Sequence, residues 1–245
     1  ATVSFNKPLE IRSDKSASAL IKASMETDSH KPIKRVDISR ERESGLSSLE
    51  KNILIKDFLD SANDEAAVIA DLSSFVCVKD SDIQHFLIEK AIPFEKAHKS
   101  RTYIMLNKDS LDTGRIEILA YFSVAMDHLL IREGVSGTLR RKLNGIFNDD
   151  RVPCYLIGQL ARNDSCPKEV LDGEEILNYA LSVLLDAHDI IGGRFVRVDS
   201  KECVGLLSFY QSNGFRLLPD KEEHGLCQLV RFISSKKQGA ATGIS

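Results

Sequence analysis

Long apolar runs are absent from this sequence of 245 residues. None approaches the roughly 20 residues that a helix needs to cross a bilayer, so we expect no membrane partner. The first residues, ATVSFNKPLEIRSDK, hold no apolar core of the kind found in a secretory signal. A cytoplasmic location is therefore expected.

Cysteine and histidine spacings typical of disulfide frameworks or metal sites are also missing. The five cysteines are odd in number and scattered, and they form no C-x-x-C pair. The six histidines include no H-E-x-x-H motif or other ligand spacing. We therefore expect reduced thiols, no disulfide framework and no metal.

An excess of charge of one sign is lacking as well. The formal net charge is −3, which gives no strong global field toward nucleic acid or anionic lipid. The compact basic cluster of the globular part is Arg140-Arg141-Lys142. Such a run is typical of a solvated face, and the alternative is contact with an anionic substrate, a nucleotide phosphate or an RNA backbone.

The composition divides the chain into three parts. Residues 1–48 are rich in Ser and in charged residues and have few large apolar ones, which predicts a polar arm, partly flexible or with one short helix. The pattern from 49 to 235 is that of a folded domain, and 236–245 reads as a flexible tail. Packing of the arm on its own domain or on a partner is the alternative for the first part.

The folded part alternates between helical and strand patterns. In its first half we expect helices over 49–61 and from about 80, the latter bent or ended at Pro93, and strands over 75–78, 101–106 and 116–126. The last third reads strand, helix, strand, helix, strand, strand, beginning with VPCYLIGQLAR and ending with LCQLVRFI. This order predicts an α/β or α+β fold with helices on the faces of a sheet.

Two places in the last third have chemical potential. A helix begins near Asp172-Gly173-Glu174, shortly after a strand, and the free backbone N–H groups of such a start bind phosphate. The three residues are equally typical of an ordinary helix start with stabilising acids. Tyr210 lies in the last turn of a helix that stops at Asn213-Gly214. Taken alone, a tyrosine there is typical of a core aromatic residue.

In this order, the two features resemble the Gcn5-related N-acetyltransferase (GNAT) family. Leu160-Ala161-Arg162 matches the family's Leu-Ala-Val segment, and Lys168 and Gly173 match an Arg or Gln and a glycine of its pyrophosphate loop. Tyr210-x-x-x-Gly214-Phe215 matches the motif Y-x-x-x-G-F. The resemblance covers residues 152–233 well and extends loosely back to about residue 50.

The resemblance implies a mixed, mostly antiparallel central sheet of six to seven strands, with helices on both faces and one splayed strand pair. Acetyl-CoA, as co-substrate, would lie in that splay, its pantetheine arm paired to the backbone of Leu160 and Arg162. Backbone N–H groups would hold the pyrophosphate, and the implied cofactor-binding residues are Leu160, Ala161, Arg162, Lys168, Asp172, Gly173 and Glu174.

The implied reaction is direct attack of an amine on the thioester. Tyr210 would be the general acid that protonates the CoA thiolate, and a backbone N–H at the splay would meet the oxyanion. Glu117, on the long central strand, is a weak candidate for the general base, and Asp199 and His128 are weaker ones. The acceptor is an amine-bearing small molecule, protein or aminoacyl-tRNA, and a homodimer is left open.

The sequence departs from the family pattern in its phosphate loop. Leu171 replaces the first glycine of that loop, NDSCPKEVLDG is long and acidic, and Cys203 stands where many members have Asn. A leucine fits there only if its φ is negative and its side chain points away. Three alternatives therefore remain: a GNAT-fold binding or regulatory module with weak catalysis, a toxin-type acetyltransferase acting on aminoacyl-tRNA, and an unrelated α/β domain.

Overall fold

The structure is a computed structural model that describes residues 50–61, 64–107, 109–110, 115–147, 149–167, 169–221 and 225–233. The expected polar arm over residues 1–48 and the tail over 236–245 lie outside the described residues. Their predicted character therefore stays a prediction. The described residues belong to the domain that begins at about residue 50.

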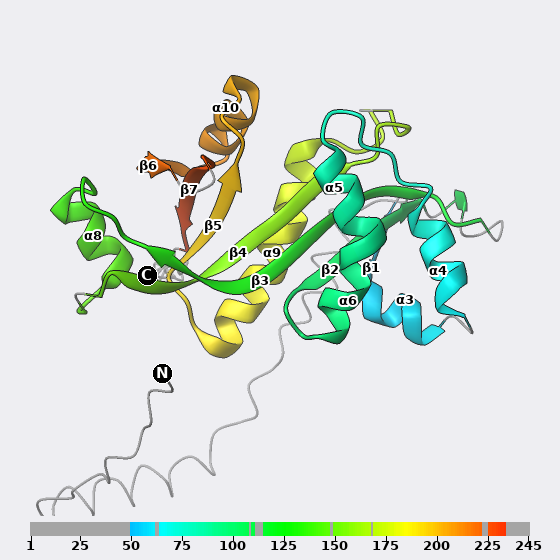
Figure 1. The fold of residues 1–245 in the computed structure, drawn as a ribbon, viewed down its shortest axis with the longest axis horizontal. Helices are drawn as coiled ribbons and strands as arrows, with labels where there is room; N and C mark the ends of the chain where they lie inside the picture. The colour runs from blue at the N-terminus through cyan, green and yellow to red at the C-terminus, as the bar shows by residue number, and fades with distance from the viewer. Residues whose placement is uncertain are drawn as a thin grey trace, which may run out of the picture. The chain divides into compact units, whose positions relative to one another are not determined.

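A seven-stranded sheet forms the centre of this domain (Figure 1). Its order is β1-β2-β3-β4-β5-β7-β6. The strands are β1 (Glu50–Leu54), β2 (Arg101–Asn107), β3 (Ile118–Leu130), β4 (Arg151–Arg162), β5 (Phe195–Ser200), β6 (Arg216–Lys221) and β7 (Cys227–Phe232). All neighbours pair antiparallel except β4 and β5, which are parallel. The predicted mixed, mostly antiparallel sheet is confirmed.

Helices pack on both faces of the sheet, as predicted. They are α3 (Ile55–Ser61), α4 (Glu65–Leu72), α5 (Ser81–His85), the π-helical turn η2 (Phe86–Lys90), α6 (Ala91–Lys96), α8 (Gly137–Asn144), α9 (Gly173–Ile191) and α10 (Val204–Ser212). One buried cluster joins α9 and α10 to β3, β4 and β5. A second joins the helices of residues 55–96 to β2 and β3, and a third joins α8 to β3, β4 and β7.

Side-chain alternation along the strands separates the two faces. Val196 and Val198 of β5 lie in the cluster with α9, so Arg197 between them points to the opposite face. Tyr121 of β3 packs in the cluster of the first helices, and Leu129 packs in the α8 cluster. We call the face that carries these last two clusters the α8 face, and the other the α9 face.

The helix expected over 49–61 is only half correct. Residues 50–54 form strand β1, which pairs along its whole length with β2, from Glu50 opposite Asn107 to Leu54 opposite Tyr103. The helix α3 begins only at Ile55. Pairing with the edge of a preformed sheet overrides the local helical pattern, a tertiary effect that a short window of sequence does not contain.

The short strand expected over 75–78 is wrong, because this segment has no strand partner among the described strands. Phe75 is fully buried, with its ring edge against Tyr121 at a centroid distance of 5.1 Å. Val78 is exposed, and its N–H donates to the Asp164 carboxylate at 2.7 Å. The apolar residues of this segment are therefore one buried core residue, Phe75, followed by a surface loop.

Pro93 does not end the helix that precedes it. The N–H of Ala91 donates to the carbonyl of Phe86, five residues back, at the end of η2. This widened turn restarts the hydrogen-bond ladder, and Pro93 then falls in the first turn of α6, where its missing N–H is tolerated. Asp80 caps α5 through its side chain.

Candidate active site

Strands β4 and β5 separate part-way along their length. They pair only at Tyr155–Val196, Leu156–Arg197 and Ile157–Val198, whereas β4 continues to Arg162 and β5 to Ser200. Figure 1 shows the two strands diverging, with α10 after the end of β5. Residues 158–162 of β4 therefore have β3 on one side and an open edge on the other. This is the splayed strand pair that the resemblance implies.

The peptide groups along this open edge can be assigned from one hydrogen bond. Asn163 N–H donates to the carbonyl of Leu119 on β3 at 2.7 Å. Backbone groups alternate between the two sides of a strand, so Ala161 also faces β3, and Leu160 and Arg162 present their N–H and C=O to the splay. An extended ligand can pair with these two residues as an added strand.

A β-bulge marks the point where the splay opens. In the β3–β4 ladder, Ser123 is opposite Gln159 and Val124 is opposite Ile157, which leaves Gly158 as the extra residue. A glycine inside a strand pattern is a signal for such a bulge. The bulge turns backbone groups out of the regular ladder directly after the last β4–β5 pair, where the resemblance places the oxyanion donor.

The start of α9 lies at the far end of this edge. Asp172 is the N-cap and forms a capping box with Glu175: each carboxylate accepts the other residue's N–H at 2.9 Å. Among the described residues, the N–H groups of Gly173 and Glu174 have no acceptor. They are donors for an anion, although the Asp172 carboxylate already occupies part of the positive end of the helix.

Leu171 fits the phosphate loop, where a leucine requires a negative φ and a side chain that points away. Its side chain is fully buried in the core against α9 and β4. His98 is the one non-glycine residue of the described part with a positive φ, so Leu171 is free of left-handed strain. The leucine thus anchors the loop and leaves the helix start open. Lys168, the other loop residue of interest, lies outside the described residues.

Tyr210 is held in an aromatic cluster on the α9 face. Its ring lies 5.1 Å from that of Phe209 and 5.5 Å from that of Phe215, both in edge-type contact. Burial raises the pKa of Tyr210 to about 12. Its hydroxyl has no hydrogen-bond partner among the residues that the structure describes. The phenol therefore stays protonated at neutral pH with its proton uncommitted.

Helix α10 packs directly on the start of α9. A Cβ added at Gly173 would lie 3.5 Å from Cε2 of Phe209. The neighbour of Phe209 is Tyr210, so the phenol and the free N–H groups belong to two elements in contact. The structure thus places the predicted residues Gly173 and Tyr210 on two helices in contact, and Leu160 and Tyr210 both pack against the buried cluster on the α9 face.

Two contacts that sequence reasoning missed fix the walls of the splay. The Asn163 side chain accepts from Val76 N–H at 3.2 Å and donates to the carbonyl of Ile118 at 2.8 Å, tying the loop of residues 73–80 to the end of β4. From the other side, Lys201 after β5 pairs with Asp80 at 2.8 Å. Of these residues, only Asn163 could have been noticed in the sequence, because an asparagine directly after a strand is typical of a turn.

The candidate bases lie in different places. Glu117 precedes β3, and its carboxylate accepts from Asn107 at 2.8 Å and Ser110 at 2.6 Å, so the structure does not bring it to the splay. His128 is exposed on β3. Asp199 lies on β5, one residue beyond the last β4–β5 pair, on the α8 face. It is paired with Arg197 at 3.0 Å.

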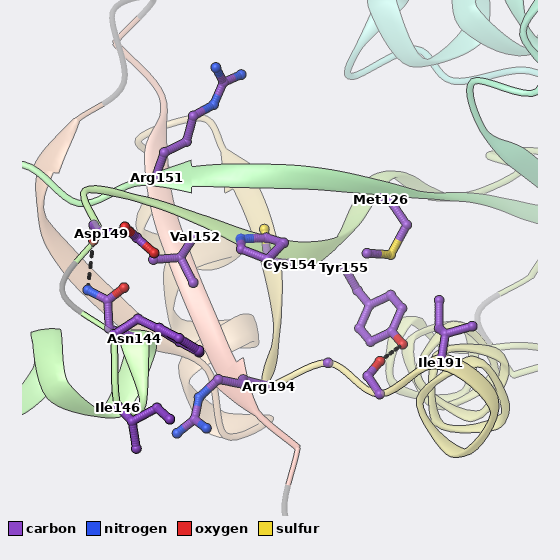
Figure 2. Close-up of a pocket in the computed structure, with 14 residues that line it drawn as sticks. Met126, Asn144, Ile146, Asp149, Arg151, Val152, Cys154, Tyr155, Ile191 and Arg194 are labelled. Atoms are coloured by element: carbon purple, nitrogen blue, oxygen red, sulfur yellow. Dashed lines mark hydrogen bonds between the residues drawn. The ribbon is translucent and has the colours of Figure 1, made fainter. Parts of the chain in front are cut away.

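A separate hollow of about 570 Å³ lies at the other end of β4 (Figure 2). Figure 2 shows Met126, Tyr155, Ile191 and Arg194 around it, and the Tyr155 hydroxyl bonded to the carbonyl of Gly192. It adjoins the first residues of β4, while the open edge comprises the last ones. The predicted site residues do not line this hollow.

Three further features bear on the class of site. Within the described ranges, no group of three or more His, Cys, Asp or Glu side chains is arranged to hold a metal ion. In the same part of the chain, no helix has the length and apolar character needed to span a membrane. Backbone N–H groups of Leu206 and Gly205 lower the pKa of the exposed Cys203 thiol at the start of α10.

Comparison with known proteins finds likeness in structure only: no family model and no curated protein matches the chain. A mutant of KacT has a TM-score of 0.57 at 20% identity, over 76% of this chain and 95% of its own. AtaT complexed with acetyl-methionyl-tRNAfMet has 0.55 at 18%, over 74% and 93%. A mutant of the toxin AtaT, bound to acetyl-CoA and the C-terminus of the antitoxin AtaR, has 0.52 at 18%, over 75% and 92%. The chain therefore has the GNAT-like fold of these proteins.

Proposed function

We propose that this protein is an N-acetyltransferase that moves the acetyl group of acetyl-CoA to an amine. The observation that carries the proposal is the open edge of β4, from the Gly158 bulge to Arg162, which leads to the free N–H groups at the start of α9. An extended arm ending in a pyrophosphate matches both parts of this surface. Acetyl-CoA present in a similar AtaT structure supports the assignment.

In the proposed site, Leu160 and Arg162 pair with the pantetheine arm, and Ala161, between them, packs against the first helices. Gly173 and Glu174 donate N–H groups to the pyrophosphate, next to the Asp172 cap. Lys168 adds a positive charge to the same loop. Glu117 has no part in this arrangement. It lies just before β3, and its carboxylate accepts a hydrogen bond from the Asn107 side chain.

The reaction needs one proton donor. The amine nitrogen forms a bond to the carbonyl carbon, and the C–S bond then breaks to release a thiolate. Tyr210 gives its proton to that thiolate and recovers one from the nitrogen, which must lose a proton to become an amide. Because burial raises the pKa of Tyr210 to about 12, its anion is costly, and this recovery must be rapid.

The acceptor is an amine on a small molecule, a protein or an aminoacyl-tRNA. The last class is favoured by the likeness to AtaT in complex with acetyl-methionyl-tRNAfMet. On α8, Arg141 and Lys142 are exposed, while Arg140 pairs with Asp150 at 2.5 Å. Two exposed cations on one helix add modest support. A cytoplasmic location and a homodimer stay predictions.

Binding and turnover of acetyl-CoA test the proposal. Acetyl-CoA should raise the melting temperature of the protein, and a panel of amines and aminoacyl-tRNA should release free CoA thiol. No thermal shift at millimolar acetyl-CoA would contradict the proposal. A shift without turnover of any acceptor would instead favour the alternative of a GNAT-fold binding module.

A further inference from the structure

A charged cluster lies on the α8 face, immediately before the splay opens. Its centre is Arg197 of β5, which is 5% exposed and opposite Leu156, one residue before the last β4–β5 pair. The guanidinium reaches across β4 to the Asp127 carboxylate on β3 at 2.6 Å and bonds to Asp199 at 3.0 Å. It also donates to the carbonyl of His128 at 2.8 Å.

The two carboxylates differ in exposure. The Asp199 side chain is 16% exposed and also contacts the Gln228 amide at 3.3 Å, whereas the Asp127 side chain is 41% exposed. Asp127 accepts one hydrogen bond from Arg197 and one from the N–H of His128 at 2.7 Å. A carboxylate has room for about four hydrogen bonds, so Asp127 can accept more from the solvent side.

One donor of the buried guanidinium is left unused. The Nε–H of Arg197 is buried and has no hydrogen-bond partner in the part of the chain that the structure describes. Leaving such a buried donor unpaired is unfavourable, because it has lost its hydrogen bonds to water. An acceptor atom of a bound molecule would satisfy it. The cluster therefore suits a ligand with an amino group that donates to Asp127 and, beside it, an oxygen that accepts from Arg197.

The location fits the second substrate of the proposed reaction. Tyr210 and the start of α9 lie on the α9 face, whereas Asp127, opposite Cys154, and Arg197, opposite Leu156, lie on the α8 face before the splay opens. A thioester held in the splay would have Tyr210 on its α9 side and the charged cluster on its α8 side.

We propose that Asp127 binds the amino group of the acyl acceptor and that Arg197 is the positioning residue that holds Asp127 in place. The role as acceptor site rests on the proposed function, but binding of an amine at this site can be tested without it. The acceptor class is a primary amine that carries a hydrogen-bonding oxygen close to the nitrogen.

The test follows the Nε–H of Arg197 by NMR in ¹⁵N-labelled protein, without acetyl-CoA, during titration with methionine amide. Arg197→Lys identifies the signal. The wild type should show a saturating shift that N-acetylmethionine amide, which lacks the amine, does not produce. Asp127→Asn should weaken binding about tenfold or more, and Asp127→Glu should restore part of it. Asp150→Asn, an exposed carboxylate paired on α8, should bind as the wild type does.

No saturating shift in the wild type, or equal binding by Asp127→Asn, would overturn the inference. Failure of the proposed function gives a different result, namely no binding of acetyl-CoA. Where turnover is measured, Asp127→Asn should raise the acceptor KM about tenfold and leave the dissociation constant of acetyl-CoA unchanged. A purely structural role of Asp127 would instead change both values together with the melting temperature.

Discussion

Gly173 and Phe209 meet where helices α9 and α10 touch, and an added Cβ on the glycine would lie 3.5 Å from the phenylalanine ring. The contact couples the proposed pyrophosphate donors to the helix that carries Tyr210. Chain segments 36 residues apart, by the difference between 209 and 173, thus form one wall of the candidate site.

Substitution of Gly173 tests this coupling. Gly173→Ala adds only a methyl at ordinary contact distance, so acetyl-CoA affinity should change less than about twofold. Gly173→Leu must push Phe209 aside and should weaken acetyl-CoA binding about tenfold or more. Calorimetric titration of both variants measures this difference. Equal affinities for the two variants would show that the contact does not constrain the cofactor site.

Asp172 should act against cofactor binding while it stabilises the helix. Asp172→Asn keeps a side chain that caps equally well and removes a negative charge next to the proposed pyrophosphate. Acetyl-CoA should then bind about two- to fivefold more tightly, from a charge effect of roughly 0.3–1 kcal/mol at a helix start.

The matched control is Asp189→Asn, near the opposite end of α9, which should leave the dissociation constant of acetyl-CoA unchanged. If Asp172→Asn bound acetyl-CoA more weakly than the wild type, the pyrophosphate would not lie at the start of α9.

Stability at high pH should report the burial of Tyr210. Its pKa is about 12 in the folded protein and about 10 in an unfolded chain. The folded state therefore holds this proton more tightly, and the stability it contributes is complete below pH 10 and falls as pH rises toward 12. The expected loss is about 1.4 kcal/mol per pH unit from this group. Burial raises the pKa of Tyr121 in the same direction.

Urea unfolding at pH 8, 10 and 11 measures this loss, and Tyr210→Phe should lessen its slope with pH. An identical slope in the variant would mean that the phenol is solvated in the folded protein.

The sequence predicted the last third of the fold because its signals are local. The strand ending at Arg162, the capped helix start at Asp172 and the helix stop at Gly214 each depend on neighbouring residues. The first half was predicted less well, since β1 exists through its pairing with β2, and Phe75 is buried without a strand.

The same distinction holds for the candidate site. Tyr210, Gly173 and the open edge at Leu160 were predicted because motifs in the last third of the sequence resemble those of the GNAT family. Asp127 and Arg197 are 70 residues apart and are joined only when β3, β4 and β5 lie side by side. Their charges carry no local pattern, so only the folded sheet reveals the cluster.

The most direct test of the proposed chemistry is the kinetics of Tyr210→Phe. The hydroxyl has no partner among the described residues, so its removal should leave the melting temperature and the dissociation constant of acetyl-CoA nearly unchanged. Loss of the general acid should lower kcat about a hundredfold or more. An unchanged kcat, or an equal loss of turnover and acetyl-CoA affinity, would contradict the assignment of Tyr210 as the proton donor.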